Sequence, residues 1–89
     1  MFDDRPLDPW IEFRQMDLAK TDLTDLRLSK ANLANTNLSE SNLAGVDISE
    51  ANLTGADLTG ANLEGAYLAG TLLDYAVLVG ANLTRASRP

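Results

Sequence analysis

Residues 51–65 have the sequence Ala-Asn-Leu-Thr-Gly, Ala-Asp-Leu-Thr-Gly, Ala-Asn-Leu-Glu-Gly, which is one five-residue unit written three times. A large apolar residue stands at the centre of each unit, and the same spacing continues in both directions along the chain. The apolar centres are Phe13, Leu18, Leu23, Leu28, Leu33, Leu38, Leu43, Ile48, Leu53, Leu58, Leu63, Leu68, Leu73, Leu78 and Leu83. The fold must therefore be one that suits a period of five residues.

A period of five suits neither regular helix nor flat strand. At about 100° per residue, a helix would scatter the centres all round its axis. In a flat strand side chains alternate between faces, so an odd period would send successive centres to opposite sides. Only a chain that bends once per unit keeps the centres together. The sequence therefore predicts an all-β solenoid in which the centres form an internal core ladder.

The other positions of the unit predict a short strand and a corner. A mostly small residue lies two before each centre, and Asn or Asp usually separates the two, which is strand alternation over three residues. All six glycines lie two residues after a centre, where we expect a positive φ. Before Gly45 the same position holds larger residues, such as Lys20 and Glu40, so we expect a different type of corner in the first half. The outward Asn and Asp columns are expected to form side-chain ladders.

The units of residues 51–65 resemble those of the pentapeptide-repeat family, and the resemblance extends over about residues 11–86. It implies a right-handed quadrilateral β-helix with four units per coil, hence roughly three and three-quarter coils; the spacing alone would also allow another polygon. Residues twenty apart would then lie directly above one another. Residues 1–10 are expected to form a short N-terminal capping segment whose apolar side chains plug the first coil, and residues 87–89 a C-terminal tail.

Composition excludes several kinds of chemistry. The chain has no cysteine and no histidine, so catalytic triads, disulfides and common zinc sites are not expected, and we predict no enzyme activity, no cofactor and no metal. The formal net charge is −6, and no Lys or Arg occurs between Ala31 and Thr84. An acidic body disfavours nucleic acid and anionic membranes as partners. With no apolar run of membrane-spanning length and no secretory signal, a cytoplasmic location is the default expectation.

The last coil departs from the repeat. Its normally polar outward positions become apolar, and two corner positions join them; these candidate interface residues are Tyr67, Leu72, Tyr75, Val77 and Val79. One explanation is a contact surface, most simply an end-to-end homodimer, because an open ladder end and exposed apolar side chains favour pairing. Two others stay open: drift in a tolerant repeat, and excision of this chain from a longer protein.

Two functions from different classes follow from the sequence. The first is a non-enzymatic protein-protein interaction or structural module that self-associates through its C-terminal coil. The second rests on the family resemblance: some pentapeptide-repeat proteins are acidic DNA mimics that bind and protect DNA gyrase. Duplex DNA carries a charge about every 1.7 Å in continuous rows. The six central acids are predicted to be spread over all four faces of the solenoid, so we rank DNA gyrase second as a partner.

Overall fold

The chain winds into a stack of coils that are each twenty residues long. The computed structural model describes residues 13–89, and every β-bridge in it joins residues twenty apart in parallel. The bridges are Asp17–Asn37, Asp22–Asn42, Asn32–Asn52, Asn37–Asp57, Asn42–Asn62, Asp47–Tyr67, Asn52–Leu72, Asp57–Val77 and Asn62–Asn82. They are isolated single-residue bridges, and no helix or longer strand is assigned within residues 13–89. Four units of five residues therefore complete one coil.

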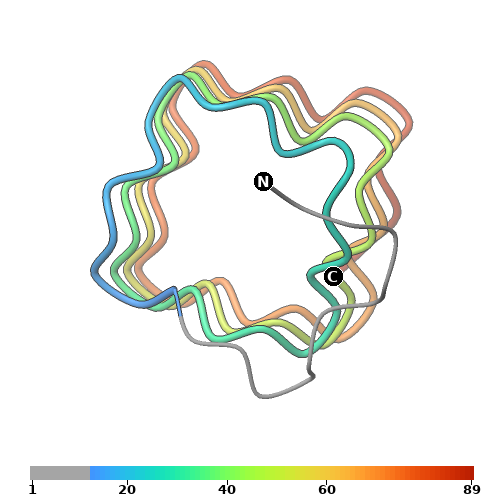
Figure 1. Cartoon of the computed structure of the whole chain (residues 1–89). Helices are drawn as coiled ribbons and strands as arrows, with labels where there is room; N and C mark the ends of the chain where they lie inside the picture. Colours follow the sequence, from blue (N-terminus) through green and yellow to red (C-terminus); the bar gives the residue numbers. More distant parts are fainter. Residues whose placement is uncertain (1–12) are drawn as a thin grey trace.

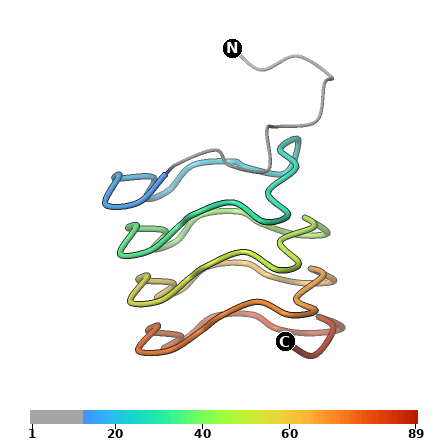
Figure 2. The ribbon, with the colours of Figure 1, turned by 90° about the horizontal axis from the view of Figure 1, so that it is seen from below.

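The outline of each coil is a square with a corner in every unit (Figure 1). Seen from the N-terminal end, the chain turns clockwise as it recedes from the viewer, so the coil is right-handed (Figure 1). The coils lie flat on one another, from residue 13 at one end to the C-terminus at the other (Figure 2). The expected capping segment, residues 1–10, lies outside the described residues.

Hydrogen bonds use all five N–H groups of a typical unit. Two N–H groups donate to the next coil, one donates to the previous coil, one closes the corner turn, and one donates to the Asn or Asp side chain of its own unit. In unit 61–65 the bonds are Leu63 N to Asn82 O (2.8 Å), Gly65 N to Thr84 O (2.8 Å), Asn62 N to Ser41 O (2.9 Å), Ala61 N to Leu58 O (2.9 Å) and Glu64 N to Asn62 Oδ1 (3.1 Å). Backbone carbonyls thus serve four of the five donors, and the outward polar residue serves the fifth.

The outward Asn and Asp side chains therefore act within their own corners. Asn52 Oδ1, for example, accepts the Thr54 N–H at 3.0 Å, which is an Asx turn. The expected ladders along a face are a minor feature by comparison: Asn62 Nδ2 donates to Asn42 Oδ1 at 3.5 Å, the long limit for a hydrogen bond. The side-chain oxygens thus accept mainly from the N–H two residues on, and among residues 13–89 the expected ladder is represented by the long Asn62–Asn42 contact.

Two of these acceptors are aspartates with lowered pKa values. The hydroxyl of Thr59, together with its backbone N–H, lowers the pKa of Asp57, and Thr24 does the same for Asp22. The bonds favour the ionised carboxylates. They stabilise the fold at pH values above the unfolded pKa, and this contribution is lost as the pH falls through the lowered folded pKa.

The corners have a positive φ in both halves of the chain. The glycine prediction is confirmed, since all six glycines have φ between 68° and 72°. The prediction of a different corner in the first half was wrong, because Gln15, Lys20, Lys30, Asn35 and Glu40 occupy the same conformation with φ between 57° and 64°. Asp25 is the exception within residues 13–89. Each such corner matches a type II turn, in which the third residue has positive φ and the fourth donates to the first.

The core follows the axis of the coil. The centres from Leu23 to Leu68 are at most 4% exposed, and the small residues between them, such as Ala31 and Ala61, are fully buried. Buried hydroxyls on the interior bond to backbone: Thr36 Oγ1 donates to Phe13 O at 2.7 Å. Towards the C-terminal end burial fails, and Leu83 is 41% exposed because no further coil covers it in the structure. Within residues 13–89 no helix is long and apolar enough to cross a membrane.

The role of the outward Asn can be tested at Asn52. Asn52→Ala removes the acceptor of the Thr54 N–H and should lower the free energy of unfolding by about 0.5–1.5 kcal/mol. Asn52→Asp keeps the acceptor oxygen and should stay close to the parent. Urea denaturation measures both. Equal loss in the two variants would mean that the amide NH₂, and therefore an inter-coil ladder, matters more than the Asx turn.

The corner geometry can be tested with two glycines of the same φ. A Cβ at Gly65 would meet nothing within 4 Å, whereas one at Gly55 would meet the Asn35 side chain. Gly65→Ala should therefore cost only the positive-φ strain, about 1–2 kcal/mol. Gly55→Ala should cost more, and the added Asn35→Gly substitution should remove the excess. Thermal melts of the three variants decide this, and identical losses at Gly55 and Gly65 would contradict the contact.

Candidate functional site

The candidate site is the C-terminal coil, which we define as residues 67–86. Five large apolar side chains are exposed on its outer side, as the sequence predicts, and the interface role assigned to them stays a prediction. Their exposed fractions are Tyr67 58%, Leu72 53%, Tyr75 90%, Val77 43% and Val79 70%. The other large exposed apolar side chains among residues 13–89 are Met16, at the opposite end, and Leu83, on the same coil. Exposed apolar surface is thus concentrated on one coil.

The coil geometry spreads these side chains over several sides. Tyr67, Leu72 and Val77 are bridged to Asp47, Asn52 and Asp57, so they occupy three successive sides of the square. Each replaces an Asx acceptor with a side chain that cannot accept at that position. The N–H groups of Ala69, Asp74 and Val79, which would use those acceptors, have no hydrogen-bond partner among residues 13–89. Three of the four units of the last coil therefore lack this side-chain bond, and the fourth keeps it through Asn82.

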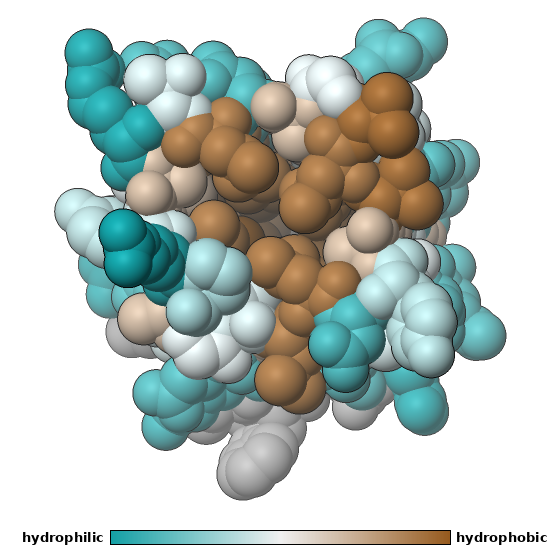
Figure 3. Space-filling view, turned by 180° about the vertical axis from the view of Figure 1, so that it is seen from behind, coloured by the Kyte–Doolittle hydropathy of each residue, from teal (hydrophilic) through white to brown (hydrophobic). Residues whose placement is uncertain are grey.

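The same coil opens into an apolar hollow on the solenoid axis. Seen from the C-terminal end, apolar side chains surround a central depression (Figure 3). The hollow has a volume of about 260 Å³ and is lined by Leu53, Leu58, Leu63, Leu68, Leu73, Leu78, Leu83, Ala86, Ser87, Arg88 and Pro89. Sequence reasoning identified the leucines as core and missed the hollow.

Ser87 ends the backbone ladder in an unusual way. Its N–H continues the register by donating to Ala66 O at 2.9 Å. Leu68 N–H, which by the repeat would donate to the Ser87 carbonyl, donates instead to Ser87 Oγ at 2.7 Å. The side chain thus takes over from the backbone at the last ladder position. From the sequence, Ser87 is predicted to lie in the C-terminal tail, and this bond is not expected.

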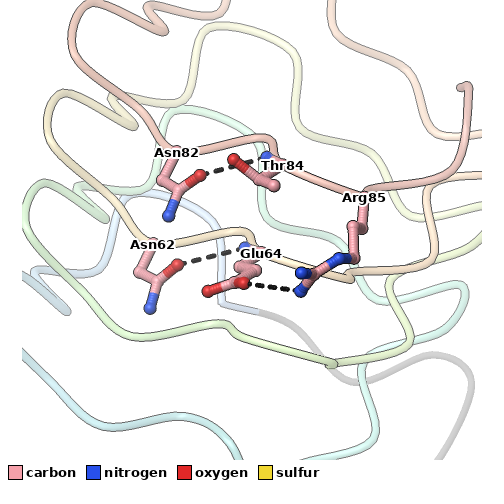
Figure 4. A network of polar contacts seen from close by, with 5 residues as sticks. All are labelled: Asn62, Glu64, Asn82, Thr84 and Arg85. Atoms are coloured by element: carbon pink, nitrogen blue, oxygen red, sulfur yellow. Dashed lines mark hydrogen bonds and ion pairs between the residues drawn. The ribbon is translucent and has the colours of Figure 1, made fainter.

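Polar contacts on the outer side of the last coils are local (Figure 4). Asn62 and Asn82 hold their corners through Glu64 N and Thr84 N, and the Arg85 guanidinium forms an ion pair with Glu64 at 3.0 Å. The pair is exposed, so it contributes little to stability. Within residues 13–89 no group of three or more Asp and Glu side chains is arranged to hold a metal ion. What the site presents to a partner is therefore the exposed apolar surface of the last coil.

Comparisons with known proteins agree with this architecture. The family model for pentapeptide repeats matches residues 21–60 and 61–87. A crystal structure of a pentapeptide repeat protein from Nostoc PCC 7120 is 41% identical, with a TM-score of 0.77 over 79% of this chain and 58% of that one. A second, from the cyanobacterium Cyanothece 51142, is 34% identical, with a TM-score of 0.64 over 86% of this chain and 54% of that one.

The chain spans a little over half the length of these two solved relatives. A comparison with curated proteins found no match. The family match covers most of the chain, and its units are the ones that the hydrogen bonds and bridges define. This chain belongs to the pentapeptide repeat family, whose members form right-handed quadrilateral β-helices.

Proposed function

We propose that this chain is a non-enzymatic protein-binding module that self-associates through its C-terminal coil. The observation that carries the proposal is the band of exposed apolar side chains on residues 67–79, which runs along three successive sides of the last coil, whereas Met16 is the one large apolar side chain exposed elsewhere among residues 13–66. Contiguous exposed apolar groups mark interaction sites more often than isolated ones do. Tyr and aliphatic residues are also the types that the buried centres of interfaces use.

The hydrogen-bond pattern favours an interaction surface, and not sequence drift in a tolerant repeat, as the explanation of these apolar residues. Each Asx turn contributes on the order of 0.5–1.5 kcal/mol, and the last coil lacks three of them because of Tyr67, Leu72 and Val77. A second copy is the simplest partner, because it presents the same apolar coil and needs no other component.

Self-association can be tested with a variant that repairs the corners. Leu72→Asp together with Val77→Asp places charge on the proposed interface and also restores two Asx acceptors, so the fold should be kept. We expect light scattering to show a dimer for the parent and a monomer for this double variant. Asn37→Asp with Asn42→Asp adds the same charge far from the coil and should remain dimeric.

The result that removes self-association is a parent chain that stays monomeric at high concentration. A double variant that remains dimeric would move the interface elsewhere on the molecule. Val77→Asp places a second carboxylate opposite Asp57, so a thermal melt of the double variant must show that its fold is kept before loss of the dimer is assigned to the interface.

The alternative function is that of an acidic DNA mimic acting on DNA gyrase, and the net charge of −6 favours it. The positions of the acids argue against it. None of Glu40, Asp47, Glu50, Asp57, Glu64 and Asp74 is twenty residues from another, so no two stack in neighbouring coils. They form no continuous row like that of DNA phosphates. We expect no change in a gyrase supercoiling assay, and protection or inhibition there would reverse this ranking.

A further inference from the structure

The four sides of the solenoid differ in the charge along their middle (Figure 1). The outward residue in the middle of each unit is bridged to its counterparts in neighbouring coils, so every side has a middle column. We call one side the Leu72 side, and its units are 31–35, 51–55 and 71–75. Its middle column is Asn32, Asn52 and Leu72. The columns of the other sides contain aspartates, which are Asp17, Asp22, Asp47 and Asp57.

Among residues 13–89 the Leu72 side thus has the one middle column without a charge. Glu12, one coil before Asn32 in the sequence, lies outside the described residues. Charged residues are depleted at the centres of protein interfaces. The charge pattern therefore singles out this side from the three others.

The Leu72 side also carries the most exposed side chain of the apolar band. Leu72, in the middle of the side, is 53% exposed, and Tyr75, at one corner, is 90% exposed. The opposite corner is formed by Gly70, which is exposed and has no side chain. A coil stacked on either end of the solenoid would lengthen this side and would not cover it. The side therefore combines a protruding ring, an apolar centre and a flat corner.

Both apolar residues of this side cost stability in the single chain. Tyr75 has a φ of 62°, a conformation that disfavours a residue with a Cβ, and its exposed ring has little packing to offset that cost. Leu72 stands where Asn would accept the Asp74 N–H, which has no hydrogen-bond partner among residues 13–89. Burial of the two side chains against a partner would offset these costs.

A second copy fits the Leu72 side for an electrostatic reason. When two copies pack side by side about a two-fold axis parallel to the solenoid, the middle column of one faces the same column of the other. On the other sides aspartates would then oppose one another, which disfavours the contact. On the Leu72 side Leu72 meets Leu72, and the Asn52 amides, which donate and accept, meet each other.

The same two-fold axis brings opposite corners of the side together. Tyr75 of one copy then lies against Gly70 of the other, so the protruding ring meets the corner that has no side chain. Asp74 follows the middle column within its unit, so it lies off the two-fold axis and does not face itself. The side is therefore complementary to itself in shape and in charge.

We propose that two copies of this chain pack side by side through the Leu72 side, with parallel solenoid axes and with Leu72 on the two-fold axis. The proposal rests on the self-association proposed above and specifies its geometry. Tyr67 and Val77 lie on the two neighbouring sides and stay outside the contact.

Four substitutions that restore the repeat residue test which side is used. Leu72→Asn restores an Asx acceptor and Tyr75→Gly removes the positive-φ strain, so both variants should melt at or above the temperature of the parent. Both should nevertheless raise the dimer dissociation constant about tenfold or more in sedimentation equilibrium. Tyr67→Asn and Val77→Asn make the matched change on the neighbouring sides and should leave it unchanged. An unchanged constant in Leu72→Asn, or loss of the dimer in either control, overturns the proposal.

Charge at residue 72 tests the two-fold axis. Leu72→Asp and Leu72→Lys each place like charges against each other, so each variant alone should be monomeric. An equimolar mixture should form a heterodimer, because the carboxylate of one copy then meets the ammonium group of the other. A mixture that stays monomeric would show that residue 72 does not meet itself, and would overturn the proposal.

Asn52→Asp tests whether the two axes are parallel. In the parallel arrangement residue 52 meets itself, so the added carboxylates should raise the dimer dissociation constant about tenfold at low salt and less at high salt. Asn62→Asp adds the same charge in the same coil on the opposite side, and the constant should stay that of the parent. Equal constants in the two variants would overturn the parallel arrangement.

These results also separate the geometry from self-association itself. A parent that is monomeric at every concentration removes both proposals. A dimeric parent whose Leu72→Asp and Leu72→Lys variants do not recombine removes the Leu72 side alone, and the interface then lies elsewhere on the molecule.

Discussion

The whole structure depends on finding an acceptor for each of five N–H groups in a five-residue unit. A buried or tightly packed backbone cannot leave donors unpaired without a cost comparable to a lost hydrogen bond. Stacking on two neighbouring coils and closing one turn satisfies four of them. The fifth has no backbone acceptor within reach, and the Asn or Asp side chain supplies one. Asn or Asp is therefore required because the fifth N–H group of each unit needs a side-chain acceptor. Leucine is required for a different reason, which is that the centre of each unit must fill the interior of the coil.

This explains which parts of the fold the sequence predicts. A five-residue register of apolar centres allows only a chain that bends once per unit, so the solenoid and the inward positions of Leu23 to Leu68 follow from residue spacing. The corner conformation followed only in part. Glycine signals positive φ, but Lys20, Asn35 and Glu40 show that larger residues adopt the same φ when the turn and two inter-coil bonds hold them there. Tertiary hydrogen bonding outweighs a local preference of about 1–2 kcal/mol.

The site was harder to predict because it consists of positions where the last coil departs from the repeat. Exposed Tyr67, Leu72 and Val77 are visible as departures from Asn and Asp, and the sequence identifies them. The hollow depends on side chains that lie next to one another only after four sides have closed, and on which column holds Ala86 in place of a residue as large as Leu26. Ser87 Oγ as a substitute for a carbonyl requires the orientation of one hydroxyl, which spacing does not contain.

The donor count also constrains how two copies can meet. Within the stack, each unit faces the C-terminal side with two N–H groups and one C=O, and faces the N-terminal side with one N–H and two C=O groups. Coils therefore stack in one direction only. Two C-terminal ends brought face to face would oppose donors with donors, so the ladder cannot continue across a symmetric contact. Any such dimer must be held by side chains, which places its stability on Tyr67, Leu72, Val77 and their neighbours.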